Sequence, residues 1–469
     1  MTTIEPMTTI EQAPADVHSE PGRTLDDEQP RTLGFWDQVA LWGNLGISLL
    51  GPTGAIFLIA PGVSMLSALV AVVAGTLIGT VLVALAALAG ARSGRPAMVL
   101  LRGLFGAKLS YLPTVLNLVQ LLGWATFELV VIAAALKQLL PWHVQWPYIV
   151  IAGVVTTIMA LWPLGAVRML RRYALVAVIV AIAYLFIQLG RNPMPSLTHG
   201  SWSGFWISAD IVIAVAVSWV PLAADYTRHS RSERAAFGGA MIGYTVTQVI
   251  CYALGLLAFT TVVSAAGTAD DQQHNLFAAF IAVPVGWLAF AVLVARELDE
   301  SFANVYSTAV SIQNPFPHID RRVLAIGVGA VATVGALVFD IGAYQDFLYL
   351  LGSLFVPMFA VFAVRYFILD RGRPWDTSET APSRWSLLVP WAVGFIAYQL
   401  VNPGSIGWWV TAWTHVQGWL HFTPQSWMSA SVISFLVAGL LTLAMGPITS
   451  RRPAAVEPVS AEPAQIGAR

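Results

Sequence analysis

Long apolar segments alternate with short polar connections along most of this chain. Twelve of the segments are long enough to cross a hydrocarbon core as a helix, which takes about 20 residues. Clusters of Asn, Gly and Pro, such as Asn192-Pro193, separate them. The pattern predicts an all-α integral membrane protein with twelve transmembrane helices. These lie at about residues 35–60, 64–91, 109–139, 147–166, 172–190, 205–227, 236–264, 283–314, 323–342, 345–369, 386–402 and 427–447.

The remaining segments are polar or too short to span. Residues 1–30 carry acids and prolines without the apolar core of a signal peptide, so we expect a disordered cytoplasmic N-terminal tail. Residues 451–469 are expected to form a cytoplasmic C-terminal tail, which leaves a transmembrane domain at 31–450. The stretch 96–108 is apolar but short, and we expect it to lie along the cytoplasmic surface.

The positively charged residues are concentrated in the segments predicted to lie on the inner side of the membrane. With the N-terminus inside, the predicted inner segments hold all but three of the 24 lysines and arginines. The exceptions are Lys137, Arg191 and Arg296, and the outer loops carry acids such as Asp270 and Asp340. By the positive-inside rule, this pattern predicts a multi-pass protein of the cell's inner or plasma membrane with both termini in the cytoplasm.

The first and sixth predicted helices contain residues that open a helix. The first includes Gly43, Gly46, Gly51 and Pro52, and the sixth has Pro221 at its centre. Glycine and proline weaken the helical hydrogen-bond ladder. Within a membrane, opened backbone is tolerated where it is buried or lines a cavity. We therefore expect helices 1 and 6 to be discontinuous.

Interrupted helices at corresponding places in two halves indicate an inverted-repeat transporter. Helices 1–5 would form repeat one at about 33–190, and helices 6–10 would form repeat two at about 204–370. Two extra helices would follow at about 385–447. A simple proline kink is the alternative for either break alone, whereas the pair favours the five-plus-five repeat.

The eighth predicted helix carries charged residues where a membrane span normally has none. Ionisable groups at such depth cost about 2.5 to 3.5 kcal/mol each on insertion scales, so they normally face a protein interior or an aqueous cavity. Polar residues recur here every three or four positions and therefore share one face of the helix. The stripe predicts a pathway for a solute and an ion. Its members are Arg296, Glu300, Asn304, Ser307, Ser311 and Asn314.

The third predicted helix, the counterpart of the eighth in the repeat, has a polar stripe of its own. Asn117, Gln120, Trp124 and Glu128 are spaced three, four and four residues apart. An indole one turn from a carboxylate suits a planar heteroaromatic solute that stacks on the ring and is hydrogen-bonded at its edge. Two alternatives stay open: Trp124 as an interfacial or packing residue, and Glu128 as a structural carboxylate paired with Arg296.

Composition agrees with a membrane protein and narrows its partners. Hydrophobic residues make up 57% of the chain and charged residues 10%, with a mean hydropathy of +0.71. A net charge of −1 gives no reason to expect a nucleic-acid partner. The single cysteine, Cys251, excludes a disulfide framework.

Three other classes of function remain to be weighed. The eight histidines fall in tails, loops or helix ends by this topology and form no HExxH motif, which argues against an intramembrane enzyme. A channel would pass solute without stoichiometric cation coupling. An amino-acid transporter of the same fold would present helix-1 amides to a carboxylate, and Glu128 argues mildly against an anionic solute.

Three strings resemble the nucleobase:cation symporter-1 family, the permeases for purines, cytosine, hydantoins and thiamine precursors. They are GWATFE in helix 3, SWVPLAADYTR in helix 6 and FANVYSTAVSIQNPFP in helix 8. FLYLLGSLFVPMFAVFAVRYF in helix 10 is similar to a fourth family pattern. The likeness covers about residues 30–400 and is greatest to the cytosine and hydroxymethylpyrimidine branch. It implies the twelve-helix, five-plus-five inverted repeat of the leucine-transporter class.

The resemblance also implies roles for substrate-binding residues. Trp124 matches the family's stacking tryptophan, and Glu128 stands where many members have a glutamine that binds the substrate. Helix 6 usually adds a second aromatic, but Ala216 stands at that position. Further substrate-binding candidates are Gln120, Ser218 and Trp219, together with Gln313 or Asn314 near the family's substrate amide.

The coupling ion is left open between Na⁺ and H⁺. Ser307 and Thr308 match two hydroxyls that bind sodium in the sodium-coupled members of the family. In those members, carbonyls of helix 1 complete the site, and here Gly46 and Leu49 are the candidates for them. Such a set of oxygen ligands suits a hard cation. However, Asp299 and Glu300 replace the commoner Thr-Asn pair of helix 8, and a buried carboxylate suits a proton relay. Candidate coupling residues are Gly46, Leu49, Glu300, Asn304, Ser307 and Thr308.

These observations predict a secondary active transporter that imports a planar nucleobase-like heterocycle, cytosine or a purine, with a cation by alternating access. The alternatives are a hydroxymethylpyrimidine thiamine precursor, a hydantoin or allantoin-type solute and, more remotely, an amino acid. The expected partners are the solute and the lipid bilayer. No cofactor is expected beyond the coupling ion, and the sequence does not determine the oligomeric state.

Overall fold

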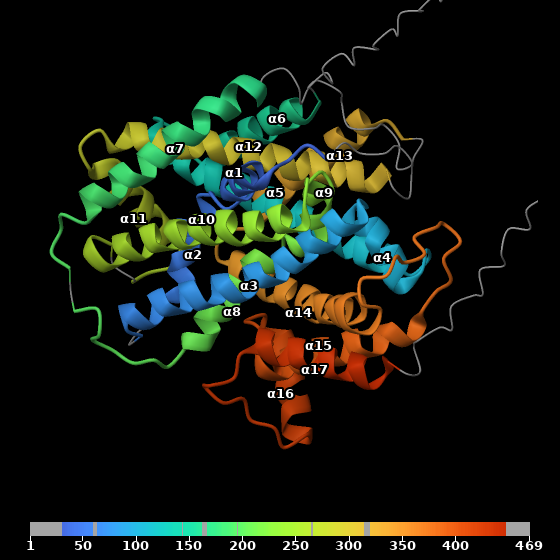
Figure 1. Ribbon diagram of the computed structural model, residues 1–469. Coiled ribbons are helices and arrows are strands. Elements are labelled where there is room, and N and C mark those ends of the chain that lie inside the picture. The colour runs from blue at the N-terminus through green and yellow to red at the C-terminus, as the bar shows by residue number, and fades with distance from the viewer. Residues whose placement is uncertain are drawn as a thin grey trace, which may run out of the picture.

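The computed structural model describes residues 31–59, 63–142, 144–161, 167–194, 196–263, 266–313 and 319–446 (Figure 1). Both predicted tails lie outside these residues. Within them, regular secondary structure is helical apart from two isolated β-bridges, as the apolar periodicity predicted. The predicted all-α class is confirmed. Nine elements make up the first half of the chain: α1 (Phe35–Leu45), α2 (Leu50–Gly54), η1 (Ala55–Leu58), α3 (Met65–Ser93), α4 (Ala97–Phe105), α5 (Tyr111–Leu139), α6 (Trp146–Leu161), α7 (Val167–Leu189) and α8 (Phe205–Val217).

The second half continues with the same kind of long helix. Its elements are α9 (Val220–Thr227), α10 (Glu233–Thr261), α11 (Ala269–Ala282), α12 (Gly286–Gln313), α13 (Arg321–Val338), α14 (Ala343–Ala363), η2 (Val364–Leu369), η3 (Trp385–Leu387), α15 (Leu388–Val401), α16 (Gly407–Trp419) and α17 (Ala430–Ala444).

Each of the twelve predicted segments contains a helix, but only some are spans by length and apolarity alone. Among the described residues, five helices are long and apolar enough to cross a membrane, and α1 with α2 and η1 makes a sixth, bent span. Shorter apolar helices occupy most of the other segments. The eighth segment forms α12, which is 28 residues long and has its charged residues in mid-helix. The structure is thus a helical membrane protein, as its apolar segments predicted.

The two predicted breaks differ in kind. Residues 46–49 interrupt the first span, whose halves are bent by 56°. The predicted discontinuity of helix 1 is therefore present. In helix 6 only Ser218 and Trp219 separate α8 from α9, and the two still continue as one span of 23 residues. Pro221 lies in the first turn of α9, where its missing N–H costs little.

Two helices were not predicted. The sequences of α11 and α16 mix polar with apolar residues, so a search for apolar spans passes over them. α11 nevertheless has a readable start: Thr268 and Asp271 form a capping box, and hydrogen bonds from Thr268 lower the pKa of the Asp271 carboxyl. α4 has all nine of its residues buried and packs against α5 and α9. Its position at the cytoplasmic surface of the membrane stays a prediction.

Pairs of neighbouring helices recur in the two halves. α1 packs against α10, and correspondingly α8 and α9 pack against α3. α5 packs against α13, and correspondingly α12 packs against α6. The α1–α10 contact is close because it is made through glycine: a Cβ added at Gly243 would lie 2.8 Å from the backbone nitrogen of Gly43. α15 and α17 form a further layer against α14 (Figure 1).

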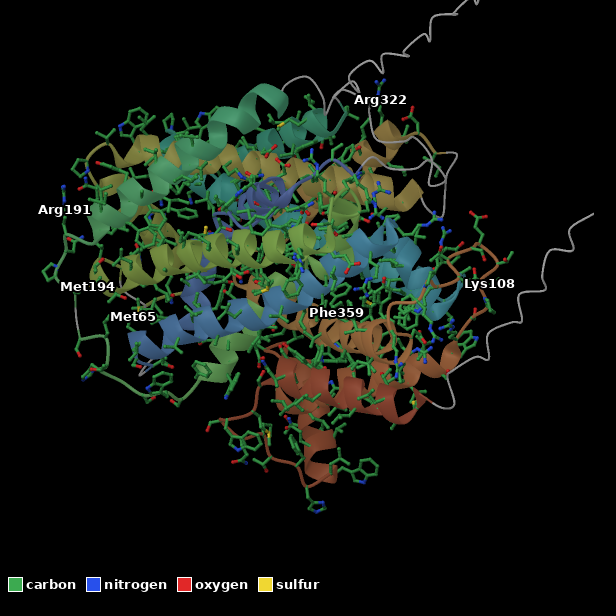
Figure 2. All side chains as sticks on the ribbon, in the orientation of Figure 1. Met65, Lys108, Arg191, Met194, Arg322 and Phe359 are labelled. Atoms are coloured by element: carbon green, nitrogen blue, oxygen red, sulfur yellow. The ribbon has the colours of Figure 1, made fainter. Side chains whose placement is uncertain are left out.

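Charged and loop residues are sorted between the two ends of the helices. Lys108 and Arg322, both from predicted inner segments, lie toward one end of the molecule, whereas Arg191 and Met65 lie at the other (Figure 2). Loop contacts agree with this division: the Ser64 backbone N–H donates to the Ser201 carbonyl at one end. At the opposite end, Arg92 and Glu233 form an ion pair of 2.8 Å.

Candidate functional site

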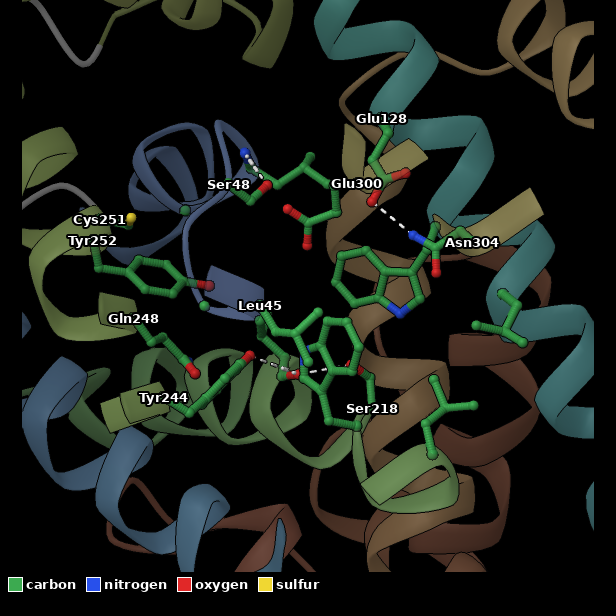
Figure 3. Close-up of a pocket in the computed structure, with 18 of the residues that line it drawn as sticks. Leu45, Ser48, Glu128, Ser218, Tyr244, Gln248, Cys251, Tyr252, Glu300 and Asn304 are labelled. Atoms are coloured by element: carbon green, nitrogen blue, oxygen red, sulfur yellow. Dashed lines mark hydrogen bonds between the residues drawn. The ribbon is translucent and has the colours of Figure 1, made fainter. Parts of the chain in front are cut away.

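A cavity lies where the breaks of helices 1 and 6 face α5, α10, α12 and α14 (Figure 3). Its empty volume, including the open space at its mouth, is about 570 Å³. Backbone of the α1 break enters the wall at Gly46 and Ser48, and the α8–α9 break contributes Ser218 and Trp219. Opened helices therefore line a cavity, as the membrane environment requires.

Two tryptophans form aromatic parts of the wall. Trp124 of α5 is held edge-on by Tyr344 and Phe347, with ring centroids 5.9 and 5.4 Å away. Trp219 is held in the same way by Trp42 and by a tyrosine of α10, each at 6.4 Å. Such contacts restrict each indole to a narrow range of orientations. Trp219, three residues after Ala216, thus places an aromatic ring in the cavity wall.

A carboxylate and an amide from different helices meet beside Trp124. Asn304 of α12 donates a 2.8 Å hydrogen bond from Nδ2 to Glu128 Oε1 (Figure 3). Glu128 is 1% exposed, and its Oε2 has no hydrogen-bond partner. The alternative pairing with Arg296 is not found, because the contacts of Arg296 are to Asp299 at 3.6 Å and to the carboxylate of residue 300 at 3.5 Å. The two polar stripes predicted from the sequence therefore do face each other.

The wall contributed by α10 was missed. Tyr244, Gln248 and Tyr252 line the cavity from this helix. Gln248 donates from its amide nitrogen to the Val212 carbonyl at 3.0 Å, which leaves its buried Oε1 without a partner. The spacing of these three residues, four apart in an apolar segment, is the signal that would have revealed them.

Some predicted substrate residues stand behind the cavity rather than in its wall. Gln120 donates from Nε2 to Asn117 Oδ1 at 2.8 Å and to the Ser218 carbonyl at 2.9 Å. It therefore holds the backbone freed at the α8–α9 break. Ser218 itself lies in the wall, and its hydroxyl donates to the Val215 carbonyl at 2.7 Å. Gln313 ends α12 without a described side chain, and Asn314 lies outside the described residues.

The predicted cation residues are distributed over two neighbouring cavities. Gly46 lines the first, and a second cavity of about 370 Å³ of empty volume includes Ser307. Glu300 and Asn304 line both. Thr308 is buried and donates to the carbonyl of Asn304 in its own helix at 2.7 Å.

One carboxylate outside the predicted site residues holds the first break. Glu297 of α12 is fully buried and accepts hydrogen bonds from the Leu49 backbone N–H at 2.7 Å and from the Ser48 hydroxyl at 2.9 Å. Leu49, predicted to offer a carbonyl to a cation, thus has its amide bound by this carboxylate.

Comparison with known proteins defines the class. Residues 26–380 match the family described as "Permease for cytosine/purines, uracil, thiamine, allantoin". The chain belongs to this family, and the predicted resemblance to the nucleobase:cation symporters is confirmed. Both the family and the fold are those of membrane transporters, so the protein is a permease and not an enzyme.

Particular relatives are similar over most of the chain. "Putative purine-cytosine permease YxlA" of Bacillus subtilis is 24% identical over 72% of this chain and 76% of its own length. "Vitamin B6 transporter TPN1" of Saccharomyces cerevisiae is 25% identical over 67% of this chain, which spans only 58% of that relative.

Solved structures share the fold. The inward-facing conformation of Mhp1 superposes with a TM-score of 0.69 at 17% identity, covering 89% of this chain and 91% of that one. Mhp1 in a closed conformation with bromovinylhydantoin bound gives 0.66 at 20% identity, covering 89% and 93%. A manganese transporter of Eremococcus coleocola gives 0.53 at 13% identity, covering 90% and 98%.

Proposed function

We propose that this permease is a secondary active transporter that imports a planar nucleobase-like heterocycle, cytosine or a purine, together with a cation by alternating access. The observation that carries this proposal is the cavity between two helix breaks in which Trp124 and Glu128 stand side by side on one helix face. A ring can stack on the indole while its edge meets the carboxylate.

The unpartnered polar atoms around the cavity favour a solute rich in N–H donors. Glu128 Oε2 and Gln248 Oε1 are buried acceptors without a hydrogen bond, and Glu300 Oε2 has only its 3.5 Å ion-pair contact with Arg296. Leaving such atoms unpaired is costly, so a bound solute that donates to them is strongly preferred over one that offers acceptors. Cytosine and adenine present an amine beside ring nitrogens, which matches this arrangement.

We also propose the full twelve-helix, five-plus-five inverted repeat. The matched neighbours of the two halves support it, since the α1–α10 and α5–α13 contacts have counterparts in the contacts of α8 and α9 with α3 and of α12 with α6. The breaks support it too. Gln120 of α5 donates to the Ser218 carbonyl, and Arg296 of α12 donates to the Asn44 carbonyl. Gln120 and Arg296 also occupy nearly the same position in their helices. Counted from the first residue of α5 and of α12, their positions differ by one residue.

The proposed orientation has both termini in the cytoplasm of a cell membrane. The concentration of lysines and arginines in the predicted inner segments supports it. Alternating access follows if solute and cation together stabilise the occluded state more than either does alone.

Radiolabelled cytosine uptake into proteoliposomes tests the transport proposal. We expect uptake driven by a cation gradient and competed by unlabelled adenine, with hydroxymethylpyrimidine, a hydantoin and pyridoxine as further competitors. Glu128→Gln keeps the shape but replaces one acceptor by a donor, and we expect at least tenfold weaker cytosine uptake. Uptake of hydroxymethylpyrimidine alone would transfer the proposal to that solute. Absence of coupled uptake for every heterocycle would refute it.

A further inference from the structure

Two adjacent charged side chains of α12 form hydrogen bonds on either side of the break in helix 1. Arg296 donates from Nη2 to the Asn44 carbonyl at 2.6 Å, in the last turn of α1. Its neighbour Glu297 accepts from the Leu49 N–H and the Ser48 hydroxyl, at the start of α2. Arg296 and Glu297 are 5% and 0% exposed, so water does not screen these contacts.

The signs of the two charges match the ends that they touch. A helix ends in unsatisfied carbonyls, which carry partial negative charge, and begins with unsatisfied N–H groups, which carry partial positive charge. The guanidinium meets the carbonyl end of α1, and the carboxylate meets the amide end of α2. A single dipeptide, Arg296-Glu297, therefore neutralises both sides of the break.

The surroundings of the guanidinium resemble the oxygen ligands of a hard cation. Besides the Asn44 carbonyl, the carboxylates of Asp299 and Glu300 lie 3.6 and 3.5 Å from its nitrogens. Backbone carbonyls and carboxylates are the oxygens that a hard metal ion takes from proteins. The guanidinium occupies this set from within the chain.

We propose that the Arg296 guanidinium is a resident cation at the first helix break, in place of a bound sodium ion, so that transport does not require Na⁺. The proposal rests on the proposed transport function and concerns its coupling. A sodium ion at Ser307 would share the second cavity with this guanidinium, which lines it as well. Two like charges in one buried cavity repel each other.

The corresponding contact at the α8–α9 break is made by a neutral side chain and not by a charged one. There the neutral amide of Gln120 donates to the Ser218 carbonyl. An amide suffices to hold a freed carbonyl, so a buried guanidinium at the first break has a further role. That role is to balance Asp299 and Glu300, which would otherwise attract a mobile cation.

The test measures sodium binding and sodium-dependent transport separately. Purified protein is unfolded thermally in NaCl and in choline chloride of equal ionic strength, without any solute. Wild-type protein is expected to show no saturable stabilisation by Na⁺, and its cytosine uptake should change less than twofold when choline replaces Na⁺. Arg296→Ala leaves the oxygens without their cation, so we expect saturable Na⁺ stabilisation and Na⁺-stimulated uptake in this variant.

Matched variants separate the resident charge from other effects. Arg296→Lys keeps a cation and should remain insensitive to Na⁺. Arg92→Ala removes an arginine whose ion pair with Glu233 is partly exposed, and it should also remain insensitive. If Arg296→Ala does not fold, the wild-type measurements still decide the question. Saturable Na⁺ stabilisation of the wild type, or wild-type uptake driven by a Na⁺ gradient, would overturn the proposal.

The measurement of sodium binding by thermal unfolding tests this proposal independently of the proposed transport function. A folded Arg296→Ala protein that gains no response to Na⁺ refutes the resident cation, whatever solute is carried. Conversely, Na⁺ binding by Arg296→Ala and not by wild type supports the resident cation even when no heterocycle is taken up, and only the transport proposal then falls.

Discussion

At the residue scale, the site joins one aromatic platform to one carboxylate on the same face of α5. Trp124 is positioned by edge contacts with Tyr344 and Phe347, and Glu128 by the amide of Asn304. The ring and the carboxylate thus have fixed places before a solute arrives. Preorganisation of this kind reduces the entropy that binding must cost.

Truncation of the platform is the first prediction at this scale. Trp124→Ala removes the surface on which a planar solute would stack, and stacking of a base on an aromatic side chain contributes about 1–3 kcal/mol. We expect affinity for the transported heterocycle to fall roughly 5- to 150-fold. The measurement is uptake as a function of solute concentration, together with size-exclusion profiles that report folding.

A conservative variant controls for the loss of packing. Trp124→Phe keeps an aromatic face and should retain most of the affinity. Equal uptake by wild type and a folded Trp124→Ala protein would contradict the stacking role and favour the packing alternative for this residue.

At the scale of elements, the two halves of helix 6 are tied to different helices by aspartates. Asp210 of α8 accepts from the Ser429 hydroxyl at 2.6 Å and from the Ala430 N–H at 2.8 Å, at the start of α17. Asp225 of α9 accepts from the Ala97 N–H at 2.8 Å, at the start of α4. Each carboxylate satisfies backbone donors that its partner helix leaves free.

The close packing of α1 on α10 gives the prediction for this scale. Gly243→Ala would place a methyl group 2.8 Å from the Gly43 backbone nitrogen, and backbone cannot move aside as a side chain can. Overpacking of this kind costs about 1–3 kcal/mol. We expect a lower midpoint of thermal unfolding in detergent and reduced uptake.

Gly327→Ala is the matched control, because a Cβ at Gly327 would meet no atom within 4 Å. Alanine is the better helix former by about 1 kcal/mol, so this variant should unfold at the same or a higher temperature. Unchanged stability of Gly243→Ala would show that the α1–α10 contact relaxes readily.

At the scale of the whole molecule, the distribution of charge supports the proposed direction of the chain across the membrane. The predicted inner residues Lys108 and Arg322 lie toward one end and Arg191 at the other (Figure 2). All three are exposed, and the single native cysteine, Cys251, is buried. The wild-type protein therefore provides a low-background scaffold for labelling.

Single cysteine variants test the proposed orientation. Arg191→Cys should react with a membrane-impermeant maleimide added to intact cells, whereas Lys108→Cys and Arg322→Cys should react only after the membrane is opened. Wild-type protein should remain unlabelled in both conditions. Labelling of Lys108→Cys in intact cells would reverse the topology.

Much of the fold followed from the sequence because a membrane imposes local rules. A segment in hydrocarbon must satisfy its own backbone, so apolar runs such as 64–91 and 236–264 can only be helices. Charged residues within a membrane span cost free energy, so the polar stripe of α12 stood out in the sequence. Helical spacing placed Trp124 and Glu128 on one face of α5. The helix α11 was not predicted because its polar residues resemble those of a loop.

Only the tertiary structure decided which of these faces meet. No spacing within a helix relates Glu128 to Asn304, or Arg296 to the carbonyl of Asn44, because those pairs depend on how distant helices pack. Helical spacing puts Tyr244, Gln248 and Tyr252 on one face of α10, but only packing turned that face toward the site. The sequence by itself determined a helical membrane protein, its apolar segments and its polar stripes, since these follow from local periodicity and the cost of burying charge. The partners of each buried polar group were decided by the fold, because hydrogen bonds and ion pairs join atoms that are close in space and not in sequence.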